Sequence, residues 1–230
     1  MKRSTSCPLY MLVFAVVLGL APKPAAAIAL AQSDTFQDGS TAGWSMGEAS
    51  PSQPVNVPSG GPGGAGDHFL RIASSGLAGP GGKMVVLSGP QWFGNYLGAG
   101  VNAITMMAAN FGNTDLALRL YLEGTAGDAH SATAVSLPAG SGWTAVRFDL
   151  NPVALSGEVV GVLAGVTGLR LYSGGAVDFP PGPAPVAALL GLDNITAVPE
   201  PPAALLLLAG LGLAALRLRR SCVWSEENPP

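Results

Sequence analysis

Residues 116–122 read LALRLYL, with leucine at every second position. A period of two places one set of side chains against a core and the other set in water, as in a half-buried β-strand. The same alternation recurs at residues 146–150 and 169–171, where Arg147 and Arg170 stand between apolar neighbours. This pattern predicts strands that each contribute one apolar face to a common core.

Further strands are predicted on both sides of this stretch. Only residues 158–166 have a helical pattern, and their glycines limit it to a short turn. Many short strands with frequent Gly, Pro, Asn and Asp turn signals predict an all-β sandwich. The additional strands are expected at residues 34–36, 68–73, 83–87, 101–108, 132–137 and 192–198.

Charge is unevenly distributed along the chain. The 230 residues are 48% hydrophobic and 11% charged, with a formal net charge of −3. Between residues 33 and 197, eleven acidic and five basic side chains give −6, whereas basic clusters lie near both ends. An acidic central region argues against nucleic-acid binding. Cys7 and Cys222 lie outside this region, so no disulfide can stabilise it.

The N-terminus has the layout of a secretory signal peptide over residues 1–31. Lys2 and Arg3 precede an apolar run at residues 9–20, which is too short to span a bilayer stably. Two A-x-A segments follow, ending at Ala27 and Ala31. Signal peptidase is expected to cut after Ala31, with Ala27 as the alternative. A retained membrane anchor is the other interpretation of this segment.

The C-terminus contains three features in order. Pro199-Glu200-Pro201 precedes an apolar run at residues 203–216, and the basic cluster Arg217, Arg219 and Arg220 follows. In lipid such a run forms a helix, and the arginines keep its end in the cytoplasm. This tail, residues 198–220, resembles the PEP-CTERM sorting signal, which exosortases are thought to cleave near the Pro-Glu-Pro motif.

The resemblance has one departure, because residues 221–230 follow the arginines, whereas the family usually ends close to them. An ordinary single-pass anchor is the alternative. Exosortase sorting would give transient attachment to the inner membrane of a Gram-negative-type bacterium, then a place at the cell surface or in the extracellular matrix.

Several short motifs follow one another through residues 32–197. Their order resembles the laminin B (laminin domain IV type A) family, which has the galactose-binding-like fold. This resemblance implies a jelly-roll β-sandwich, flanked by the signal peptide and a single transmembrane helix. The motifs are DTF at 34–36, Gly43-Trp44, the Gly-Pro-rich residues 60–64 before FLRI at 69–72, Trp143, LRL at 169–171 and LDNI at 192–195.

Galactose-binding-like sandwiches often hold one structural calcium between the first and last strands. By this resemblance, the implied ligands here are Asp38, Asp193 and Asp34. Calcium takes carboxylate and carbonyl oxygens and is bound outside cells even by weak sites. Turn chemistry is the alternative, since Asp38-Gly39 is a favourable turn pair and Asp193 can cap backbone amides.

Sugar-binding sites typically combine aromatic faces with polar side chains beside them. Trp92, Asn95 and Tyr96 lie in a Gly-bounded segment that is predicted to be a loop, and Tyr121 is expected on the outward face of its strand. These four residues are the predicted ligand-binding set. Alternatively, Trp92 and Phe93 cover one end of the core. Trp44 and Trp143 are expected in the core or at a strand edge.

No catalytic site is predicted. His68 is expected at a strand start and His130 in a turn at residues 127–131, and neither lies near a G-x-S-x-G motif. The expected protein is a non-catalytic, exopolysaccharide- or matrix-binding module. A structural surface or biofilm protein without a sugar ligand is the alternative, and a polysaccharide hydrolase with an unrecognised carboxylate pair is a third.

Overall fold

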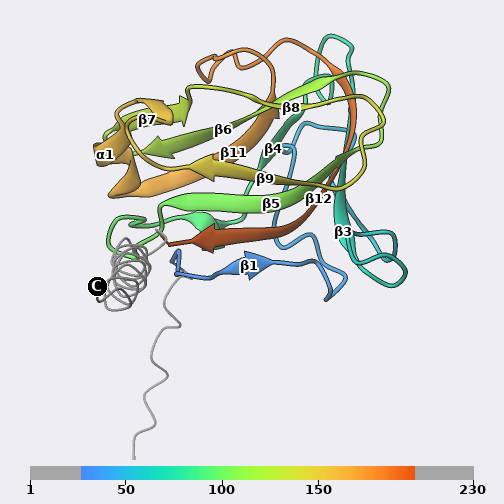
Figure 1. Cartoon of the computed structure of the whole chain (residues 1–230). Helices are drawn as coiled ribbons and strands as arrows, with labels where there is room; N and C mark the ends of the chain where they lie inside the picture. The colour runs from blue at the N-terminus through green and yellow to red at the C-terminus, as the bar shows by residue number, and fades with distance from the viewer. Residues whose placement is uncertain (1–26, 200–230) are drawn as a thin grey trace, which may run out of the picture.

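A computed structural model describes residues 27–199, which form a sandwich of two antiparallel β-sheets (Figure 1). The predicted all-β sandwich is confirmed. Most of the predicted signal peptide and of the predicted sorting tail lies outside the described residues. Within residues 27–199, no helix is both long and apolar enough to cross a membrane.

Sheet A has the long strand β12 near its centre, with neighbours from distant parts of the sequence. Its order is β2 (Val55–Val57), β3 (Phe69–Ser75), β12 (Ala187–Val198), β5 (Ala103–Asn110) and β9 (Thr144–Asp149), and β1 (Ser33–Asp34) also pairs with β12.

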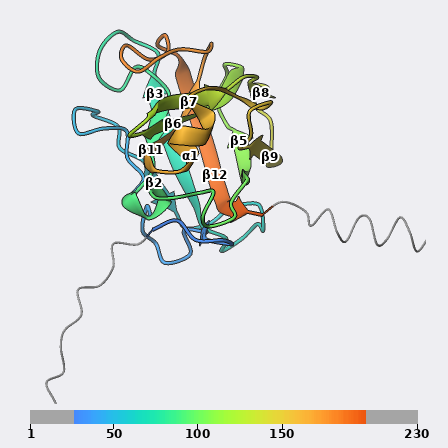
Figure 2. The ribbon, with the colours of Figure 1, turned by 90° about the vertical axis from the view of Figure 1, so that its left-hand side faces the viewer.

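Sheet B covers the other side of the core. Its order is β10 (Leu155–Gly157), β7 (Gly127–Ser131), β6 (Leu116–Gly124), β11 (Val166–Ser173) and β4 (Val85–Leu87), and β8 (Val135–Leu137) pairs with β6. Strands β3 to β6 alternate between the sheets, as in a jelly roll. The short helix α1 (Val159–Leu163) lies at one end of the sandwich (Figure 2).

The leucines of residues 116–122 lie in the core between the sheets. Leu118, Leu120 and Leu122 are fully buried and share one apolar cluster with Ile72 and Leu190 of sheet A. Full burial of such a side chain contributes about 1.5–3 kcal/mol to the free energy of folding. The alternation in the sequence therefore identified one wall of the core.

Some elements differ from the sequence predictions. Residues 127–131, predicted as a turn, form strand β7, which is joined to β6 by a tight hairpin in which Gly124 pairs with Gly127. Only Ala129 and Ser131 of β7 are buried, so its polar sequence lacks a strong apolar alternation. Strands β2 and β10 also lie outside the predicted strands, and each has only three residues.

Candidate functional site

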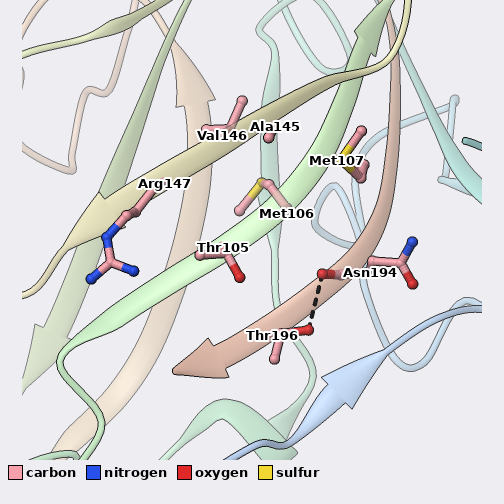
Figure 3. Close-up of a pocket in the computed structure, with 8 residues that line it drawn as sticks. All are labelled: Thr105, Met106, Met107, Ala145, Val146, Arg147, Asn194 and Thr196. Atoms are coloured by element: carbon pink, nitrogen blue, oxygen red, sulfur yellow. Dashed lines mark hydrogen bonds between the residues drawn. The ribbon is translucent and has the colours of Figure 1, made fainter. Parts of the chain in front are cut away.

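An open groove lies on sheet A where strands β5, β9 and β12 run side by side (Figure 3). Its volume is about 510 Å³, within the range of small-molecule sites. It is called the sheet A groove below. Its lining residues are Thr105, Met106, Met107, Ala145, Val146, Arg147, Asn194 and Thr196.

The pairing of the three strands brings these side chains together. Met107 pairs with Ala145, and Thr105 pairs with both Arg147 and Thr196. Because side chains alternate along each strand, these five residues project from the same outer face of the sheet. The groove therefore presents methyl, thioether and hydroxyl groups beside one guanidinium.

The side of the groove formed by Asn194 results from an irregularity in β12. The register between β12 and β5 shifts between Asp193 and Thr196, and Asn194 has a φ of 51°. This bulge leaves the Asn194 side chain exposed at the groove. The Thr196 hydroxyl donates to the Asn194 carbonyl oxygen at 3.0 Å, which fixes the backbone there (Figure 3).

Asp193 lies directly before the bulge and is fully buried. Its carboxylate accepts hydrogen bonds from the Asn194 backbone N–H at 2.7 Å and from the Asn194 amide at 3.1 Å. Burial raises the pKa of Asp193 to about 6, and the Asp67 carboxylate adds to this effect. The side chain that shapes the bulge is thus a weakened acid.

An aromatic cluster lies on the same sheet face. The rings of Phe69, Phe111 and Trp143 are 5.3–5.8 Å apart. Gly191 of β12 lies beneath them, and a Cβ added there would come within 2.7 Å of Phe111. Trp143 lies directly before β9, and its ring would lie 2.9 Å from a Cβ added to Gly191. The face therefore extends from aromatic rings to the sheet A groove.

The charge of the groove is small. Arg147 Nε and Asp149 Oδ1 are 2.6 Å apart, and both side chains are about half exposed. The eight lining residues, all within the described part of the chain, include no carboxylate, histidine or cysteine. Such an apolar and hydroxyl-bearing lining can bind an uncharged ligand.

The prediction that Trp92 and Tyr96 bind a ligand is wrong, because both side chains are 0% exposed. Trp92 ends a 3₁₀ turn (Pro90–Trp92), and the Tyr96 hydroxyl donates to the Trp92 carbonyl oxygen at 2.8 Å. Burial raises the pKa of Tyr96 above its usual range. The alternative interpretation, in which Trp92 covers the end of the core, matches the structure.

The other two predicted ligand residues, Asn95 and Tyr121, do not line the sheet A groove. Asn95 is exposed, and its side chain accepts a hydrogen bond from the Gly98 backbone N–H at 2.7 Å, as in a turn. Tyr121 faces outward from sheet B but is only 2% exposed. The Phe179 ring packs against it at 4.7 Å, and Arg170 lies over both rings.

The carboxylate of each predicted calcium ligand accepts hydrogen bonds from groups of the protein. Asp38 is exposed and accepts hydrogen bonds from the Ser40 N–H and hydroxyl at 2.9 Å, as turn chemistry predicts. Asp34 accepts from two tryptophans, and Asp193 from Asn194. Residues 27–199 contain no group of three or more His, Cys, Asp or Glu side chains placed to hold a metal.

No protein-family model and no curated protein sequence matches the chain. Among solved structures, an exo-β-agarase superposes with a TM-score of 0.54 and 11% identity over 75% of this chain and 26% of that chain. A second agarase has a TM-score of 0.52 and 12% identity over 75% of this chain and 24% of that chain. The family 11 carbohydrate-binding module of Clostridium thermocellum has a TM-score of 0.45 and 11% identity over 74% of this chain and 97% of that chain.

The agarase structures share the jelly-roll sandwich with this chain, and identities this low show the fold alone. The chain spans about a quarter of their length. The class that the structure defines is therefore an all-β jelly-roll sandwich with an open groove on one sheet face.

Sequence reasoning missed the sheet A groove. Alternation places Ala145 and Arg147 outward, but it does not tell which strands lie beside β9. Asn194 carried a recognisable signal, since Asp-Asn in a strand disfavours regular pairing and Asn tolerates positive φ.

Proposed function

We propose that this protein is an exported, non-catalytic polysaccharide-binding β-sandwich whose ligand lies in the sheet A groove. The observation that carries the proposal is the groove itself, an open face of apolar and hydroxyl side chains shared by three strands. Sugars have apolar C–H faces and hydroxyl edges, which such a surface can contact together. The groove lies open on the outer face of the sheet, where part of a sugar chain can reach it.

The chemistry of the lining favours an uncharged polysaccharide. Arg147 is paired with Asp149, and the central region of the chain is acidic, so an acidic polysaccharide would meet a repulsive field. The hydroxyls of Thr105 and Thr196 and the amide of Asn194 supply donors and acceptors for sugar hydroxyls.

Export and sorting complete the proposal. The basic start and apolar run at residues 1–20 support cleavage by signal peptidase, and residues 199–220 support transient anchoring in the inner membrane and processing by an exosortase. The protein then acts at the cell surface or in the exopolysaccharide matrix of a Gram-negative-type bacterium.

A structural surface protein without a sugar ligand is the second candidate. One observation favours it: no lining residue of the groove is aromatic, and the rings of Phe69, Phe111 and Trp143 pack on one another. If the protein has only a structural role, we expect it to retain no polysaccharide under any condition.

Affinity electrophoresis of the purified protein in gels that contain neutral or acidic polysaccharides distinguishes the two candidates. We expect retardation by at least one neutral polysaccharide. Ala145→Glu places a bulky charge in the groove, and Val153→Glu adds the same charge at a loop position that is 91% exposed. Binding should weaken at least tenfold with Ala145→Glu and remain unchanged with Val153→Glu. Equal retardation of both variants would show that the ligand lies elsewhere.

A further inference from the structure

The segment just before β1 is part of the folded sandwich. The Ile28 side chain is 6% exposed and belongs to the main apolar cluster. Its backbone N–H donates to the Phe93 carbonyl oxygen at 2.8 Å. The fit is close, since a Cβ added to Gly94 would lie 3.3 Å from the Ile28 Cγ2. Ile28 therefore fills a specific place in the core.

The residues after Ile28 extend the ladder between β1 and β12. The Ala31 N–H donates to the Ala197 carbonyl oxygen at 3.0 Å, and the Ala197 N–H donates to the Gln32 carbonyl oxygen at 2.9 Å. The Gln32 amide donates to the Gln91 carbonyl oxygen at 2.9 Å. Ala27 is exposed, as are Ala29 and Leu30. Ile28 is thus the first buried residue of the described segment 27–199.

The burial of Ile28 distinguishes the two possible cleavage sites, of which the sequence alone favours the one after Ala31. Signal peptidase requires small residues in an A-x-A arrangement, which Ala25 and Ala27 supply at one site and Ala29 and Ala31 at the other. Cleavage after Ala31 removes Ile28 from the core and the Ala31–Ala197 hydrogen bond from the sheet. Of the residues that the structure describes, 27–199, cleavage after Ala27 removes only Ala27, which is exposed.

We infer that signal peptidase cleaves after Ala27, so that the mature protein begins at Ile28. The inference rests on the proposed export of the chain and reverses the order of preference that the sequence gives. The new terminal ammonium group can still donate to the Phe93 carbonyl oxygen, because an ammonium carries three N–H donors. Loss of the exposed Ala27 opens that group to solvent.

N-terminal sequencing and intact mass of the full-length protein after expression and export in a Gram-negative host test this inference. Ala25→Leu and Ala29→Leu are matched variants, since each blocks the outer small residue of one site. We expect the wild type and Ala29→Leu to begin at Ile28, and Ala25→Leu to lose at least nine-tenths of that form.

A mature protein that begins at Gln32, or a change of N-terminus in Ala29→Leu, overturns the inference. An exported protein that still begins at Met1 overturns it together with proposed removal of the signal peptide. Neither result depends on the polysaccharide assay, so failure of cleavage after Ala27 and failure of sugar binding are distinguishable.

Discussion

Asp34 connects the first strand to the aromatic part of the core. Its Oδ2 accepts hydrogen bonds from the indole N–H groups of Trp44 at 2.8 Å and Trp92 at 2.7 Å, and from the Gln91 amide at 3.2 Å. The two indole rings lie 6.3 Å apart. A buried carboxylate with three donors satisfies groups that would otherwise be unpaired inside the protein.

Replacing Asp34 by alanine should destabilise the fold strongly. Asp34→Ala leaves two buried indole N–H groups without an acceptor, and we expect a loss of about 3 kcal/mol in the free energy of unfolding. Asp38→Ala is the control, because Asp38 is exposed and bonds only to nearby Ser40. Urea unfolding followed by tryptophan fluorescence measures both. Equal midpoints for the two variants would contradict the role of Asp34.

At the residue scale, the sequence identified Asp34, Asp38, Trp92 and Tyr96 as notable but could not assign their environments. Asp34 is separated from Trp44 by 10 positions and from Trp92 by 58, and no local pattern reveals that they meet. Gly-bounded aromatic residues look the same in a binding loop and in a loop that closes a core. Burial depends on long-range packing, which composition does not encode.

At the scale of elements, alternation predicted the strands that have one continuous apolar face, such as β6 and β9. It missed β2, β7 and β10, which are short and mostly polar or exposed. It also gave no strand order, because a period of two specifies which side of a sheet a residue occupies but not its neighbours. The sheet A groove depends on that order, so it could not be predicted.

The raised pKa of Asp193, beside the bulge in β12, predicts that the stability of the sandwich depends on pH. The folded pKa of Asp193, about 6, lies above its ordinary value of 3.8. Between pH 3.8 and about 6, Asp193 is therefore protonated in the folded state and ionised in the unfolded state. The contribution of Asp193 to stability is fully present below about pH 4 and is lost as the pH rises through 6. The difference between the folded and unfolded pKa values of Asp193 corresponds to at most about 3 kcal/mol in the free energy of unfolding.

Asp193→Asn should remove this dependence. In the presence of a chelator, we expect the melting temperature of the wild type to fall relative to that of the variant between pH 4 and 7. Thermal unfolding at several pH values measures it, with Asp38→Asn as an exposed control. Parallel curves for wild type and Asp193→Asn would contradict the assigned pKa.

The same measurement tests the calcium that the laminin B resemblance implies. If calcium binds at Asp193, millimolar calcium should raise the melting temperature of the wild type above pH 6 and leave Asp193→Asn unchanged. An equal response of both proteins, or none in either, would argue against Asp193 as a ligand.

At the scale of the whole molecule, both ends of the fold lie beside the same strand. Val198 is the last residue of β12, where it pairs with Ala103, and its carbonyl oxygen accepts from the Asn102 N–H at 3.0 Å. Ala31 and Gln32 bond to Ala197 of this strand. The Pro-Glu-Pro motif begins at the next residue, Pro199. Cleavage within or after this motif would therefore leave every strand pairing of residues 27–199 intact.

Processing of the tail should accordingly release the sandwich without weakening it. We expect the mature exported protein to lack residues 205–220 and to melt within about 2 °C of the tail-bearing form, because β12, the last strand of the sandwich in residues 27–199, ends at Val198. Glu200→Ala should block release in a host with an exosortase, and Glu226→Ala, beyond the arginines, should not. Intact mass and membrane fractionation report the outcome. A surface protein that retains its tail, or equal release of both variants, would contradict sorting through the motif.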